Sequence, residues 1–143
     1  MDATAALIPW AGERNVPLRV LTIDLRATTL ARSVSPAVLV DGRQYVVDWG
    51  RVALEVPADR PVHVCVLALH RRPLGVASLV LMPDREPVLE YSAPSHLSMA
   101  GELGAPGTTS HRGRGLQVGL LTVLALAVAA FVAIVVMAVA ALG

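Results

Sequence analysis

The sequence predicts an all-β fold, a small antiparallel β-sandwich of six to seven strands, followed by a flexible linker and one C-terminal transmembrane α-helix. Apolar and polar residues alternate between residues 18 and 94, as in half-buried strands. Turn-forming residues recur there about every eight to twelve residues. The last stretch carries no charge at all. We therefore divide the chain into an N-terminal arm (1–17), a β-sandwich domain (18–94), a juxtamembrane linker (95–117) and a transmembrane helix (118–142).

The C-terminal stretch determines how the rest of the chain is interpreted. Val118 to Leu142 contains no charged side chain and one hydroxyl, that of Thr122. A helix of this length reaches about 37 Å, and a hydrocarbon core is about 30 Å thick. Only Gly143 follows, so we expect a tail anchor that attaches the preceding domain to one face of a membrane.

The strands are predicted from their period of two. Leu21, Ile23 and Leu25 alternate with polar neighbours, which predicts a strand with one buried face. Later segments repeat this pattern and end at Pro- or Gly-containing turns. In two of these segments the pattern gives the expected inward residues, which are Val52, Leu54 and Val56 in the first and Val62, Val64 and Val66 in the second. Two further strands are expected at 76–82 and 88–91. Between the first two strands, 27–36 is expected to be a loop, and a helical turn at 29–33 is the alternative that the sequence leaves open.

A β-hairpin is the clearest local prediction. Asp41-Gly42 separates two β-rich runs, and this pair suits a type I′ turn because both central residues need positive φ. On the second strand Tyr45, Val47 and Trp49 share a face. We expect this face to point into the core, with Trp49 against the strand that carries Val64 and Val66.

Composition limits the cellular setting and the class of partner. All 12 basic residues are Arg, a usage typical of a GC-rich bacterial genome. Up to Ser110 there are ten Arg against eleven Asp and Glu, so no basic field is present to bind nucleic acid. The N-terminus has no basic region of a signal peptide, and Arg112 and Arg114 precede the apolar stretch. By the positive-inside rule the domain is expected on the cytoplasmic side of the cell membrane.

Two resemblances follow from short motifs. Val40-Asp41-Gly42, Trp49-Gly50 and Val56-Pro57-Ala58, followed by a strand with His63 and then Gly75, resemble small β-sandwich repeats of the PEGA type and related carboxypeptidase-regulatory-like domains. The Pro-Glu-Gly-Ala tetrapeptide itself is absent, and Asp59 replaces the usual Gly after the Val-Pro-Ala turn.

The end of the domain is similar to short actinobacterial single-pass membrane proteins of unknown function, through Tyr91-Ser92-Ala93-Pro94 and Gly101-Glu102-Leu103-Gly104. The resemblances imply a non-catalytic module and carry over no active-site residues.

Few side chains suggest chemistry. His63 and Cys65 project from one face of a strand, and His70 or His96 would be needed as a third ligand of a metal site. The alternative is ordinary packing of a covered sheet face, which we favour because no Cys-x-x-Cys or His-x-x-x-His is present. We therefore expect no enzyme, no cofactor, no metal and no catalytic residue.

The expected function is contact with another protein. Thr122, Ala125, Ala129 and Ala133 form a stripe of small residues on the apolar helix, which favours a close approach of a second helix. We expect partners in the lipid bilayer and in another membrane protein or a second copy, with the β-sandwich as an interaction module or accessory subunit. The alternative is an envelope-side sandwich that binds cell-wall material or an extracytoplasmic partner.

Overall fold

The computed structural model describes residues 6–96, 98–112 and 114–142. Contacts divide the chain into two units, Met1–Arg112 and Gly113–Gly143, and the first of them is the β domain. Its elements are β1 (Leu7–Ile8), β2 (Leu18–Arg26), the 3₁₀ turn η1 (Ala31–Ser33), β3 (Ser35–Val40), β4 (Arg43–Val46), β5 (Gly50–Pro57), β6 (Val62–Leu69), β7 (Pro73–Leu81), β8 (Val88–Ser92) and β9 (Glu102–Gly104). The second unit holds α1 (Arg114–Leu142).

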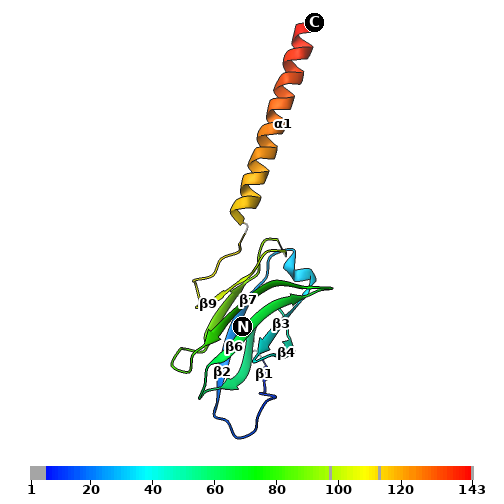
Figure 1. The fold of residues 1–143 in the computed structure, drawn as a ribbon. Helices are drawn as coiled ribbons and strands as arrows, with labels where there is room; N and C mark the ends of the chain where they lie inside the picture. Colours follow the sequence, from blue (N-terminus) through cyan, green and yellow to red (C-terminus); the bar gives the residue numbers. More distant parts are fainter. Residues whose placement is uncertain (1–5, 97, 113, 143) are drawn as a thin grey trace. The chain divides into compact units, whose positions relative to one another are not determined.

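Two sheets form the β domain, which confirms the predicted all-β class (Figure 1). One sheet has the order β1-β5-β2-β8-β9 and the other the order β4-β3-β6-β7. The chain alternates between them: β2 lies in the first sheet, the β3-β4 hairpin in the second, β5 in the first, the β6-β7 hairpin in the second, and β8-β9 in the first. Each sheet is therefore assembled from segments distant in sequence.

The five-stranded sheet differs from the purely antiparallel prediction. β2 pairs with β8 in parallel, with Thr22 opposite Val88, and β1 pairs with β5 in parallel. Short loops cannot connect neighbouring parallel strands. Here the chain between β2 and β8 passes through both sheets, so no short crossover is needed. The antiparallel prediction rested on the short connections between consecutive strands, which exclude a parallel crossover only for strands that follow each other in sequence.

Nine strands occur among the described residues, against the six to seven expected. The additional pairs come from segments assigned to the arm and the linker. β1 pairs with β5 through Leu7 and Ala53, and β9 pairs with β8 through Leu103 and Tyr91. Sequence reasoning did not find β1 and β9, because a pairing of two or three residues has too few positions to show a period.

The core is aliphatic and follows the predicted alternation. Leu21, Ile23 and Leu25 of β2 are buried, and so are the predicted inward residues of β5 and β6. The Asp41-Gly42 turn has φ of 47° and 80°, so both central residues adopt the left-handed conformation that a type I′ turn requires. The alternation and the turn are confirmed predictions, and η1 shows that the alternative of a helical turn before β3 is the one adopted.

Trp49 packs against the core but is only half buried. Its ring stacks on Tyr91 with the centroids 6.3 Å apart, and its indole N–H donates to the carbonyl oxygen of Val34 at 2.8 Å. The predicted face of the hairpin is therefore correct. Trp49 packs against the core cluster that contains Val64 and Val66, and the stack on Tyr91 and the bond to Val34 are contacts that the sequence did not predict.

A buried tyrosine explains the motif pair noted at the end of the domain. The Tyr91 hydroxyl donates to the carbonyl oxygen of Gly75 at 2.6 Å. A Cβ on Gly101 would lie 2.5 Å from the Tyr91 ring and 2.6 Å from the Gly75 oxygen, so Gly101 has no room for a side chain. The two motifs thus form one packed unit of β8 and β9, and Gly101 is a packing residue of the domain.

Candidate contact surfaces

The side chains considered for metal binding do not form a site. His63 is exposed and Cys65 half buried, on the same face of β6 as predicted. His70 lies in the β6-β7 turn and His96 beyond β8. Among the described residues, the structure brings no three His, Cys, Asp or Glu side chains together in a way that could hold a metal ion. Burial raises the pKa of the Cys65 thiol, which makes it a poor nucleophile.

The helix has the length and composition predicted for a membrane span. Within α1, Gly119–Ala140 comprises 22 residues with a mean hydropathy of 3.0 and no buried residue. Thr122, Ala125, Ala129 and Ala133 lie along it, and their use as a helix interface stays a prediction. Arg114 is the first residue of α1, and its side chain lies outside the described part of the structure.

Arg112, the other orientation signal, is held by the β domain. Its Nε donates to the Glu102 carboxylate at 2.9 Å, and its backbone carbonyl accepts from the Ser95 N–H at 2.8 Å. The predicted linker is therefore attached to the sandwich as far as Arg112. Sequence reasoning missed this because Ser, Thr and Gly are typical both of linkers and of segments held by polar side chains.

The segment 107–112, which we call the strap, is fixed by two glutamates. Glu90 of β8 accepts from the Thr109 hydroxyl at 2.5 Å and from the Gly107 N–H at 3.3 Å. Glu102 of β9 accepts from the Ser110 N–H at 2.7 Å, in addition to Arg112. The hydrogen bond from Thr109 is the main cause that lowers the pKa of Glu90, and the bond from Arg112 is the main cause for Glu102.

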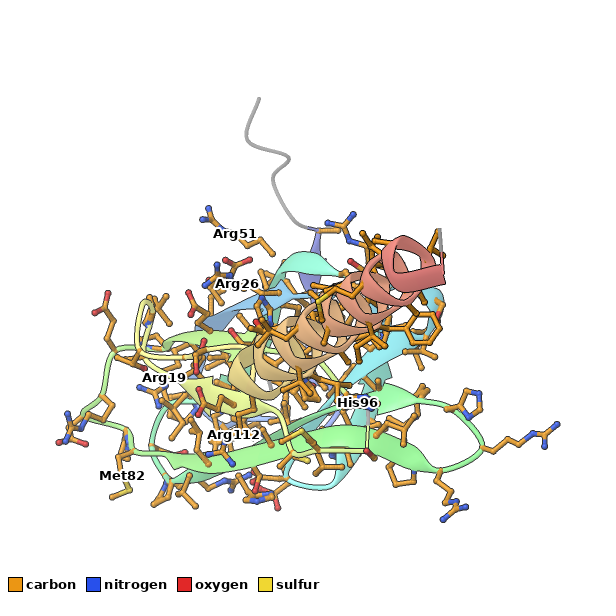
Figure 2. All side chains as sticks on the ribbon, turned by 90° about the horizontal axis from the view of Figure 1, so that it is seen from above. Arg19, Arg26, Arg51, Met82, His96 and Arg112 are labelled. Carbon is orange, nitrogen blue, oxygen red and sulfur yellow. The ribbon has the colours of Figure 1, made fainter. Side chains whose placement is uncertain are left out.

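The strap lies on the outer surface of the five-stranded sheet. We call this surface the charged face, because the pairing register places six charged side chains on it: Asp24, Arg26, Arg51, Glu55, Glu90 and Glu102. Arg26 and Arg51 are seen on one side of the domain in Figure 2, with Met82, which follows β7, on the other. Arg26 also forms an ion pair with Glu90 at 3.4 Å.

The outer surface of the four-stranded sheet has a different composition. Besides Ser35, Leu69 and Pro73 at one end, the pairing register places ten side chains of β4, β3, β6 and β7 on it: Gln44, Val46, Ala37, Leu39, His63, Cys65, Leu67, Val76, Ser78 and Val80. We call this surface the apolar face. None of these ten described residues is Asp, Glu, Lys or Arg, although both strand ends and turns nearby carry charges.

Several aliphatic side chains of the apolar face are accessible. Val46 is 62% exposed, Val80 56% and Val76 40%, while Leu39 and Leu67 between them are half buried. Val46, Ala37 and Leu67 are paired in one row across β4, β3 and β6, in which Ala37 is fully buried, and a β-bulge at Leu67 shifts the register toward β7. A contiguous apolar area on a soluble domain is typical of a protein or membrane contact.

Two hollows flank these surfaces. One of about 320 Å³ lies between β7 and the strap, lined by Ser78, Glu102 and Thr109 among others. A second of about 530 Å³ lies at the β6-β7 turn beside Arg71 and Arg72. His70 and Ser98 both line the second hollow, but the hydrogen bonds found among the described residues do not join them. Tyr91, whose pKa burial raises to about 12, is a structural hydrogen-bond donor.

No protein-family model, no curated protein and no solved structure matches this chain. The resemblances to PEGA-type domains and to actinobacterial membrane proteins therefore rest on the quoted motifs alone. The geometry of the two faces carries the functional argument.

Proposed function

We propose that the chain is a single-pass membrane protein whose β-sandwich works as a protein-interaction module through its apolar face. The observation that carries this proposal is the face itself: ten outward positions across four strands without a charged residue, in a domain whose other sheet is charged outside. Exposed valines on a sheet surface are poorly solvated, and covering them is favourable.

The helix supports the membrane part of the proposal. The 22 residues of Gly119–Ala140 are enough to cross the apolar core of a bilayer, and their mean hydropathy is 3.0. Their side chains are exposed in the helix by itself, and lipid would surround them in a membrane. Confinement to a membrane raises the effective concentration of any membrane-bound partner. A modest contact surface then suffices for binding.

Orientation is proposed from the basic residues that precede the helix. Arg112 and Arg114 favour a cytoplasmic β domain at the cell membrane. Protease added to spheroplasts should then leave the domain intact, whereas permeabilised cells should show cleavage. Digestion in sealed spheroplasts would favour the envelope-side alternative.

The contact role is tested by photo-crosslinking in living cells. A photoreactive residue replaces Val46 on the apolar face, and in a matched strain it replaces Val20, which is 46% exposed on the outer surface of β2. Position 46 should give defined crosslinked products in the membrane fraction, and these should disappear when Val80→Asp is added. Equal products from positions 46 and 20 would contradict the assignment of the apolar face.

A further inference from the structure

The apolar face differs from most recognition surfaces in carrying no charge with which to select a partner. Specific surfaces for a different protein usually combine apolar anchors with complementary charges at defined positions. A neutral aliphatic face is complementary to itself, because two copies brought together place no like charges opposite each other. Its polar members lie toward the edges: Gln44 and Ser78 are the two ends of the row that passes through Leu39 and Cys65, and His63 is in the adjacent row, opposite Val80.

The size of the face also limits its occupant. Four strands at about 4.8 Å spacing and six residues at about 3.3 Å each give a face of about 20 by 20 Å, or about 400 Å². Pairing two such faces would bury about 800 Å² in total, below the roughly 1,600 Å² of a standard stable interface. The occupant must therefore be held nearby by something else, and a second copy anchored in the same bilayer always meets this condition.

We propose that the apolar face binds the apolar face of a second copy of this chain in the same membrane, forming a two-fold symmetric dimer by face-to-face packing of the four-stranded sheets. This inference rests on the proposed function and names the partner. Two sheets that pack in this way interdigitate side chains at about 10 Å separation. Leu39 and Leu67, on the two central strands of the sheet, would lie at the centre of the contact.

The chain contains its own probe for this arrangement. Cys65 is the single cysteine, and it lies on the central strand β6 within the apolar face, opposite Leu39 of β3. In a two-fold packing of these faces, residues near the centre approach their own copies. A short bismaleimide can then join two Cys65 thiols without any engineered residue.

The experiment uses the full chain, purified in mild detergent and reconstituted into liposomes. Crosslinking is carried out at mildly alkaline pH, because the thiolate is the reactive form and burial raises the pKa of the Cys65 thiol. The expected product has twice the mass of the chain and is absent from Cys65→Ser. It should persist when α1 is replaced by an unrelated apolar helix, which separates the sheet contact from a helix contact.

Matched charge substitutions identify the face. Val80→Asp should lower the crosslinked fraction at least about tenfold, because two copies would then bury like charges in one interface. Val20→Asp places the same charge at a similarly exposed position on the charged face and should change the fraction by less than about twofold. Val46→Asp, on the opposite edge strand, repeats the test, and thermal unfolding of each variant identifies any that fail to fold.

The outcomes separate this inference from the proposed function. A wild-type chain that gives no double-mass product in liposomes, or equal losses in Val80→Asp and Val20→Asp, overturns the dimer. If position 46 still crosslinks in cells to a protein of different mass, the interaction module stands with another partner. If neither product forms, both proposals fail.

Discussion

The two outer surfaces of the sandwich lie over the same aliphatic core and differ in almost every other respect. The charged face carries six ionisable side chains, and the chain's own strap covers the part formed by β8 and β9. The apolar face carries no Asp, Glu, Lys or Arg among its ten positions, and its valines Val46, Val76 and Val80 are exposed. The strap covers part of the charged face, whereas the apolar face is open to a contact with another molecule. Substitutions on the charged face should therefore change the attachment of the strap, and substitutions on the apolar face should change binding.

The largest effect is expected from the core that both faces share. Trp49→Ala should lower the free energy of unfolding by about 3 to 5 kcal/mol, since it removes the stack on Tyr91 and leaves a cavity. Thermal and denaturant unfolding measure this change, with Trp49→Phe as the control that keeps most of the packing. A loss below about 1 kcal/mol would mean that the hairpin does not close the core as described.

The second largest loss of stability is expected at Gly101, whose lack of a side chain lets the start of β9 pack against Tyr91. Gly101→Ala should cost about 1 to 3 kcal/mol, because the new Cβ collides with the Tyr91 ring and the Gly75 oxygen. Gly107→Ala is the matched control: it has a positive φ of 78° but open space around it, so it reports backbone strain alone. Equal losses from both would show that the fit against Tyr91 is not the cause.

The strap should respond to the loss of one hydroxyl. Thr109→Val removes the donor to Glu90 and the partner of the buried Ser92 hydroxyl, at a cost of about 1 to 2 kcal/mol. Trypsin should then cut faster after Arg112. Thr108→Val is the control, since the Thr108 hydroxyl bonds only to the neighbouring Ala105 carbonyl. Unchanged cleavage in Thr109→Val would contradict the assigned anchoring.

Acid should loosen the same segment without affecting the apolar face. The pKa of Glu90 is lowered in the folded chain, so its contribution to stability is present above the ordinary pKa of about 4.3 and is lost as the pH falls through the lower folded value. Hydrogen exchange of residues 107–112 should therefore rise below about pH 4 while β3 and β6 stay protected. In Glu90→Gln this rise should be smaller, and an identical pH profile would exclude Glu90 as its cause.

The smallest effect is expected on the apolar face. Val80→Thr should change the free energy of unfolding by less than about 0.5 kcal/mol, since the side chain is 56% exposed and its burial contributes little within one domain. Denaturant unfolding of dilute protein in detergent measures this. A larger loss would mean that the face is already covered within the single chain, and the contrast between the two surfaces would fail.

Sequence reasoning recovered what depends on local period and turn chemistry. The buried faces of β2, β5 and β6 and the Asp41-Gly42 turn follow from alternation and from two positive φ angles. It did not recover the parallel pairing of β2 with β8, the two short strands or the strap, because these depend on which distant segments meet. The apolar face was visible only once the register placed residues of separate strands, such as Val46, Leu67 and Val80, on one side of the sheet.

The pairing of β2 with β8 also sets the timing of folding during synthesis. Arg26 and its partner Glu90 are 64 residues apart, and ribosomes add about 5 to 20 residues per second. The edge of β2 that pairs with β8 therefore stays unpaired for about 3 to 13 seconds after β2 is synthesised, which is a long exposure of a strand edge. Since α1 follows only ten residues after β9, the sandwich closes and the hydrophobic helix emerges almost together. The exposed β2 edge is thus covered at about the time when the hydrophobic helix appears, so chaperones and the insertion machinery meet these two aggregation-prone segments one after the other.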